Sequence, residues 1–137
     1  MPGITELKLL IASMKPNLIE GEFVFCCVPP SMLTDYIHLK PIGMFHEKEG
    51  MTLILPIEAA RQAGLPAEPA MRMISLDVHS SLEAVGLTAA FAMALGSEGI
   101  SANVVAAYYH DHIFVPIADA ERAMAALKAL SAGQDRP

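Results

Sequence analysis

The residues best suited to bind a ligand are the polar residues that precede an uncharged stretch of the chain. Ser80-Ser81-Leu82-Glu83 has the form of a capping box, with a hydroxyl at the N-cap and a carboxylate three residues later. We therefore expect a helix to begin near Ser81, where unpaired N–H groups and the helix dipole would favour an anion such as an amino acid's α-carboxylate. Gly86 would let a ligand approach the backbone closely. The alternative is that Ser80 and Glu83 only cap the helix and Gly86 only lets it pack on a sheet.

A second candidate is a metal site at His110-Asp111-His112. Residues i and i+2 of a strand share a face, and histidine is a common metal ligand. The same residues lie where a tight turn is expected, and turns favour Asp. A third ligand could come only through folding, from His79 or His38. We expect a turn and no metal site. Because no G-x-S-x-G, H-E-x-x-H or phosphate-loop motif occurs, we also expect no catalytic residue and no cofactor.

These candidates lie in a segment that predicts a strand, a helix, a hairpin and a second helix. Large apolar residues mostly alternate over residues 71–79, and no residue from Ala84 to Leu95 is charged. β-Branched and aromatic runs flank His110-Asp111-His112, as in a hairpin. The predicted strands lie near residues 71–79, 101–109 and 112–117, and the predicted helices near 81–97 and 119–131. This order is that of a βαββαβ ferredoxin-like unit without one strand.

The first half of the chain repeats part of this pattern in a weaker form. Residues 53–61 and 114–122 each contain a strand, then Pro-Ile, then a helix start. Residues 7–12 and 22–28 are apolar and predict strands, and Glu47-Lys48-Glu49-Gly50 predicts a hairpin turn. The first half therefore resembles the second with its first helix shortened or removed.

The division between the halves is expected near residues 64–70. Residues 31–40 lie between prolines and predict a loop with at most one helical turn. The join itself is too short and too apolar for a flexible linker. We expect a degenerate unit at residues 1–66 and a second unit at residues 67–137, packed together as one compact body.

Two stretches carry a family resemblance: residues 76–87, LDVHSSLEAVGL, and residues 99–116, GISANVVAAYYHDHIFVP. They closely resemble a family of small bacterial ACT-domain proteins of unknown function, which are similar to the ACT regions of aspartate kinases and to the CASTOR-type arginine sensors. The resemblance covers residues 20–131. It implies an α+β fold of two fused, ferredoxin-like ACT units with antiparallel sheets, the first unit being degenerate.

The same resemblance implies a non-catalytic regulatory or sensor protein. It implies that a small amino acid binds at the loop between the first strand and first helix, or at a unit interface. Carried over by position, the ligand-binding residues are His79, Ser80, Ser81, Glu83, Ala84, Val85 and Gly86, with Asn103, Val104 and Val105 on the facing strand. Asn103 is a polar amide in an apolar strand, so it bonds either to the backbone of a neighbouring strand or to the ligand.

Two other functions stay open. One is a structural or protein-interaction module that has kept the fold and lost ligand binding, to which the shortened first half would be suited. The other is a small metal-binding enzyme that uses His110, Asp111 and His112. A panel of amino acids and a metal analysis would separate these functions from the amino-acid sensor.

Composition excludes several kinds of partner. The net charge is −6, with five Lys/Arg against seven Asp/Glu in residues 1–66 and four against eight in residues 67–137. No basic cluster is present, so we expect no nucleic acid partner. No apolar run approaches the ~20 residues of a membrane span, so we expect no membrane partner and a cytoplasmic protein. Cys26 and Cys27 would point to opposite faces of a strand and are poorly placed to form a disulfide.

The uncharged helix also predicts self-association. It has two apolar faces, one made of Leu82, Val85, Ala89 and Met93 and the other of Leu87, Phe91 and Leu95. A sheet covers only one face of a helix, so the other half of the chain or a second copy must cover the remaining one. We expect a homodimer.

Overall fold

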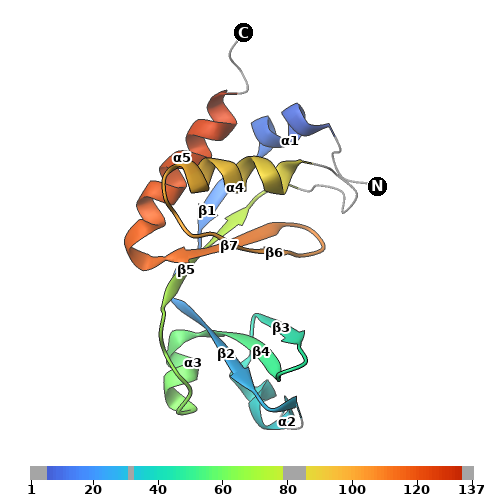
Figure 1. Ribbon diagram of the computed structural model, residues 1–137, viewed down its shortest axis with the longest axis vertical. Coiled ribbons are helices and arrows are strands. Elements are labelled where there is room, and N and C mark those ends of the chain that lie inside the picture. Colours follow the sequence, from blue (N-terminus) through green and yellow to red (C-terminus); the bar gives the residue numbers. More distant parts are fainter. Residues whose placement is uncertain (1–5, 31–32, 79–85, 134–137) are drawn as a thin grey trace. The chain divides into compact units, whose positions relative to one another are not determined.

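The chain forms two compact units, which we describe separately (Figure 1). The computed structural model describes residues 6–30, 33–78 and 86–133. Unit 1 consists of Met1–Glu20 and Arg72–Pro137, and unit 2 of Gly21–Met71. This differs from the expected division into residues 1–66 and 67–137. The reason is that the N-terminal twenty residues pack with the second half of the chain.

The sheet of unit 1 has the strand order β1-β5-β7-β6. Its strands are β1 (Pro16–Leu18), β5 (Met71–Leu76, in this unit from Arg72), β6 (Asn103–Ala106) and β7 (Asp111–Pro116). β1 pairs antiparallel with β5, with Asn17 opposite Ser75, and β6 pairs antiparallel with β7. The strand that the second half of the sequence seemed to lack is therefore supplied by the N-terminal segment.

Three helices build the core of unit 1 with this sheet: α1 (Leu7–Ser13), α4 (Leu87–Ser97) and α5 (Ala120–Gly133). α1 and α4 each pack against α5. The buried positions of α4 are Leu87, Phe91 and Leu95, which are spaced four residues apart and lie on one helix face. They join strand residues such as Ile74 and Ile113 in a single apolar cluster.

The expected strand at residues 7–12 is wrong, because this segment is helix α1. A short continuous apolar run does not distinguish a buried strand from a buried helix. The buried residues here are Leu10, Ile11 and Met14, whose spacing of one and four residues fits a helix and not a strand.

Helix α4 begins later than expected. Its N-cap is Gly86, whose φ of 97° lies in the left-handed region and cannot belong to the helix. The capping box at residues 80–83 lies outside the described residues. The start expected near Ser81 is therefore wrong for α4, which runs from Leu87.

The tip of the β6–β7 hairpin also differs from expectation. The Ala107 N–H donates to the His110 carbonyl at 3.1 Å, which closes the turn over residues 107–110. Asp111 and His112 lie in β7, paired with Ala106 and Val105. β6 consequently ends earlier than predicted, β7 begins at Asp111 and not at His112, and the aromatic pair Tyr108 and Tyr109 occupies the exposed turn.

The last helix confirms its prediction. A 3₁₀ turn, η3 (Ile117–Asp119), leads directly into α5. Ala120, Ala123 and Leu127 form its buried stripe at helical spacing.

Unit 2 has the strand order β3-β4-β2. Its elements are β2 (Phe23–Val28), α2 (Leu33–Tyr36), η2 (Ile37–Leu39), β3 (Gly43–His46), β4 (Met51–Pro56) and α3 (Ile57–Gln62). Both neighbouring pairs are antiparallel, and Phe23 also pairs with Met71 at the start of β5. The expected hairpin turn at residues 47–50 and the shortened first helix are confirmed, but α2 and η2 together exceed the single helical turn expected within residues 31–40.

The core of unit 2 forms where alternate residues of β2 and β4 face α3. It contains Val24, Cys26 and Val28 from β2, and Met51, Leu53 and Leu55 from β4. Cys26 is buried and Cys27 exposed, and both are free, as their neighbouring places on a strand predicted. Each unit thus combines an antiparallel sheet with helices, in agreement with the α+β fold expected from sequence. Among the described helices, none is long and apolar enough to cross a membrane.

Candidate functional site

The structure describes part of the ligand site that the sequence predicted. Gly86, Asn103, Val104 and Val105 are described, whereas His79, Ser80, Ser81, Glu83, Ala84 and Val85 lie outside the described residues. The described part consists of the start of helix α4 and strand β6, both in unit 1.

Gly86 is a glycine for reasons that need no ligand. Its left-handed backbone conformation strongly favours glycine. A Cβ atom at this position would also lie 3.0 Å from Cδ2 of Leu7, on helix α1. The small size of residue 86 therefore makes room for the side chain of Leu7, so the neighbour is a helix and not the sheet named in the packing alternative.

The N-terminus of α4 presents backbone donors. The first N–H to bond within the turn is that of Ala90, which donates to the Gly86 carbonyl at 2.9 Å. The N–H groups of Leu87, Thr88 and Ala89 precede it and have no acceptor inside the helix. Within the described residues no side chain caps this end of α4. A helix of eleven residues with uncapped donors can bind a carboxylate there.

The three predicted residues of β6 do not share one face of the sheet. Val104 packs against the core beneath the helices, so the alternation of a strand places Asn103 and Val105 on the opposite face. Nδ2 of Asn103 donates to the Phe114 carbonyl at 3.3 Å. This is the backbone bond that the sequence allowed as one of two alternatives. Of the three, only Val104 lies on the same side of the sheet as α4.

Polar side chains near the hairpin hold β5 and β7 together. Oγ of Ser75 and Nδ1 of His112 are 2.7 Å apart. Nδ1–H of His110 donates to the Val78 carbonyl at 3.3 Å, and Nε2 of His110 lies 4.0 Å from Oδ1 of Asp77. The bond from His110 therefore holds the chain just after β5, at Val78.

Burial shifts the proton affinity of two groups in this region. It raises the pKa of Asp111, against the opposing effect of positive charge on His112 and His110. It also lowers the pKa of His112, an effect that charge on His110 increases and the carboxylate of Asp111 opposes. Adjacent strand residues point to opposite faces, so Asp111 and His112 do not converge on one point. In residues 6–30, 33–78 and 86–133, no three His, Cys, Asp or Glu side chains are grouped so as to hold a metal ion.

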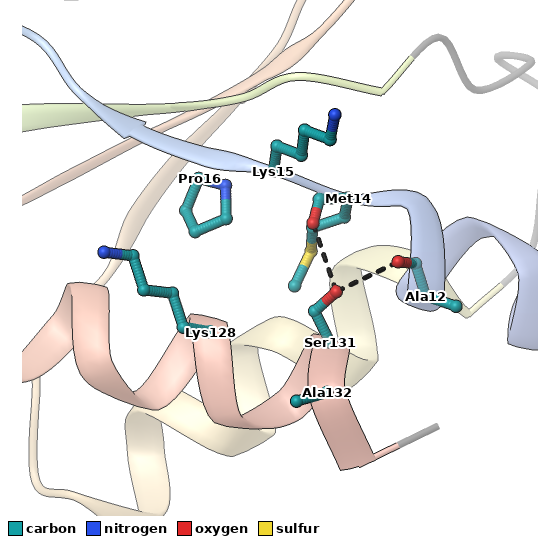
Figure 2. Close-up of a pocket in the computed structure, with 7 residues that line it drawn as sticks. All are labelled: Ala12, Met14, Lys15, Pro16, Lys128, Ser131 and Ala132. Carbon is teal, nitrogen blue, oxygen red and sulfur yellow. Dashed lines mark hydrogen bonds between the residues drawn. The ribbon is translucent and has the colours of Figure 1, made fainter. Parts of the chain in front are cut away.

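A pocket of about 330 Å³ lies elsewhere in unit 1 and was not foreseen from the sequence. Figure 2 shows it between the end of α1, the start of β1 and the last turns of α5. Its lining residues are Ala12, Met14, Lys15, Pro16, Lys128, Ser131 and Ala132. The two ends of the chain supply these residues, so no local motif could have indicated them.

Residues 2–129 are covered by matches to one family. An ACT-domain family model matches residues 2–72, which is more than half of the chain, and a second ACT-domain model matches residues 67–129. The two matches meet at residues 67–72, close to the expected join. The comparison with curated proteins gave no match.

Solved structures show the same architecture. A protein of unknown function from Vibrio cholerae, described as a possible transport protein, is 53% identical over 91% of this chain and 95% of that chain, with a TM-score of 0.83. The ligand-free regulatory subunit of aspartate kinase from Thermus thermophilus is 13% identical over 86% of this chain and 98% of its own, with a TM-score of 0.62. The corresponding subunit from Thermus flavus is 13% identical over 86% and 96%, with a TM-score of 0.61. The chain belongs to the ACT-domain family.

Proposed function

We propose that this protein is a non-catalytic regulatory protein of the ACT family that binds a small amino acid where β5 leads into α4. The observation that carries this proposal is that ACT models match both halves of the chain, residues 2–72 and 67–129. The similarity to regulatory subunits of aspartate kinase supports a regulatory function of this kind.

The start of α4 is the better of the two equivalent places in the chain. In unit 1 this helix has eleven residues, whereas its counterpart in unit 2, α2, has four. Only the longer helix presents a full first turn of unpaired N–H groups together with an appreciable dipole. The donors would be the N–H groups of Leu87, Thr88 and Ala89, and their partner the α-carboxylate of the amino acid.

The polar groups near the hairpin support the absence of catalysis. His110 bonds the Val78 carbonyl, and His112 bonds the Ser75 hydroxyl. Both histidines thus hold strands in place, which is a structural use of their ring nitrogens.

Self-association through α4 forms part of the same proposal. Met93 is 74% exposed, on the face of α4 opposite its buried stripe. A large apolar side chain exposed to this degree, on a helix without charged residues, suits a contact with a second copy.

A thermal-shift panel of the common amino acids tests the proposed function. We expect one amino acid, or a few of related chemistry, to raise the melting temperature. A ligand present at about 100 times its Kd adds roughly 2.7 kcal/mol to the free energy of unfolding, which is readily measured in a domain of this size. If no amino acid changes the melting temperature at millimolar concentration, the protein does not bind amino acids and acts as an interaction module.

A further inference from the structure

The pocket at the end of α5 has rigid walls. The Ser131 hydroxyl lies 3.2 Å from both the Ala12 and the Met14 carbonyls, to which it donates, and so it ties the end of α1 to α5 (Figure 2). On the strand side, the Asp77 N–H donates to the Lys15 carbonyl at 2.8 Å. Met14 is buried. The pocket thus lies between segments whose backbones are fixed by hydrogen bonds.

Its charge is opposite to that of the chain. Lys15 and Lys128 are the charged side chains of the lining, and no Asp or Glu is among the lining residues. Among the described residues, no carboxylate oxygen lies within 4.0 Å of either ammonium group. The protein as a whole carries a net charge of −6. Two unpaired lysines beside one pocket are therefore a local positive site in an acidic protein.

Neither lysine is placed by a helix dipole, since the last turn of α5 holds no basic residue and Lys15 precedes strand β1. Figure 2 shows the two lysines extending in different directions from different elements that border the same pocket, with Pro16 between them and Met14 beside Ser131. The combination of an apolar floor and two cationic borders is that of a site for a small organic anion.

We propose that this pocket binds a small dianion: a short dicarboxylate, or a metabolite bearing a phosphate group. The lysine ammonium groups would pair with the negative charges, as lysine does with carboxylates and phosphates elsewhere. The carbon skeleton would lie against Met14 and Pro16. A volume of about 330 Å³ is at the small end of ligand sites, which suits a metabolite of this size.

Binding at this pocket would reinforce unit 1. The lining joins α5 to the segment that leads into β1, so a ligand adds bonds between the two ends of the chain. Helix α1 ends at the pocket with Ala12, and Leu7 near its start lies against Gly86 at the N-cap of α4. The inference itself does not depend on amino-acid binding at α4.

Isothermal titration with three probes tests the site: succinate, inorganic phosphate, and the uncharged succinamide. We expect succinate or phosphate to bind at low ionic strength, more weakly as salt is added, and succinamide not to bind. Whichever of the two anions binds with the higher affinity shows whether the site prefers a dicarboxylate or a phosphate. If neither anion binds, the inference is wrong.

Paired variants locate the binding. The double variant Lys15→Gln and Lys128→Gln should weaken binding of the better anion by at least about tenfold, since both charge-assisted bonds to the anion would be lost. The control is Lys8→Gln with Lys48→Gln, which removes the same charge from exposed positions outside the pocket. It should change the affinity by less than about twofold, because distant exposed charges are largely screened. Equal losses in the two double variants would mean a general charge effect and would overturn the site.

Amide NMR spectra add a readout that does not depend on a variant. The anion should shift the resonances of Ser131 and Ala132 before others, and shifts confined to another part of the chain would contradict the inference. The amino-acid panel, repeated on the double variant Lys15→Gln and Lys128→Gln, keeps the two sites apart. If an amino acid still raises the melting temperature of this variant, the amino acid binds at α4 and not at the lysine pocket. This conclusion holds whether or not the variant still binds succinate or phosphate.

Discussion

At the scale of single residues, His112 shows how burial makes stability depend on pH. Nδ1 of its ring is hydrogen-bonded to Oγ of Ser75 at 2.7 Å, and burial lowers the pKa of His112. The folded protein therefore holds this proton less tightly than the unfolded chain, whose histidine titrates near pH ~6.5. Below that value the unfolded chain binds more protons, so this residue makes the free energy of unfolding fall as the pH drops towards the lowered pKa. Asp111 has the opposite effect, because burial raises its pKa above the usual value of about 3.8. The folded protein then binds this proton more tightly than the unfolded chain, so Asp111 makes the free energy of unfolding rise as the pH drops towards about 3.8.

We predict that His112→Gln reduces the pH dependence of stability. The glutamine keeps a hydrogen-bonding group for Ser75 and cannot take up a proton. Urea unfolding at about pH 5.5 and about pH 7.5 should show a smaller loss of stability on acidification than in the unsubstituted protein. His46→Gln is the matched control, since His46 is an exposed histidine in unit 2. A loss on acidification that is unchanged in His112→Gln would show that His112 does not control this transition.

At the scale of elements, periodicity predicted most of the fold. The hairpin of β3 and β4, the last helix α5 and the short helix in unit 2 all follow from local patterns of apolar residues and turn residues. Helix α1 does not, because Leu7 to Ala12 is apolar except for Lys8 and so suits either a strand or a helix. The fourth strand of unit 1 could not be located either, since β1 pairs with β5 across a long stretch of chain. Such pairing is a tertiary contact that no local pattern contains.

Neighbouring leucines in α1 distinguish the helix from the expected strand. Leu10 is fully buried, whereas Leu9 is 51% exposed. We predict that Leu10→Ala lowers the free energy of unfolding by about 2–5 kcal/mol, the usual cost of truncating a buried leucine. Leu9→Ala should cost less than about 0.5 kcal/mol, as exposed positions do. Ile11→Ala is the third variant and decides between helix and strand. In a helix both Leu10 and Ile11 can be buried, so both substitutions lower the free energy of unfolding. In a strand adjacent residues face opposite sides, so only one of the two substitutions should do so. Denaturant unfolding measures all three, and a cost for only one of Leu10 and Ile11 would contradict helix α1.

The candidate site was predictable only in part, for physical reasons. A helix start that follows a strand was expected near Ser81, but Gly86, in its left-handed conformation, puts the start of α4 at Leu87. The contact that occupies the space beside Gly86 comes from Leu7, nearly eighty residues earlier, and is therefore invisible to spacing. The pocket of Lys15 and Lys128 is formed in the same way, by residues from the two ends of the chain.

At the level of the whole molecule, we predict a homodimer in which α4 of each copy forms part of the contact. We expect light scattering to give the mass of a dimer, and Met93→Glu to give that of a monomer. The reason is that a carboxylate on both copies would be buried in the contact without a partner. Gln62→Glu, at an exposed position on helix α3, is the control and should leave the dimer intact. A monomer mass for the unsubstituted protein at high micromolar concentration would refute the dimer and leave the fold unaffected.

Two substitutions of one residue test whether an amino acid binds to backbone N–H groups at the start of α4. Thr88→Pro removes a backbone N–H that has no partner within the helix, in the first turn, where proline is best tolerated. Thr88→Ala removes only the hydroxyl and keeps the N–H. The measurement is the melting temperature of each variant with and without the best amino acid from the panel. We expect Thr88→Ala to keep the ligand-induced shift and Thr88→Pro, folded as judged by circular dichroism, to lose it. A full shift in folded Thr88→Pro would contradict the claim and place the amino acid elsewhere.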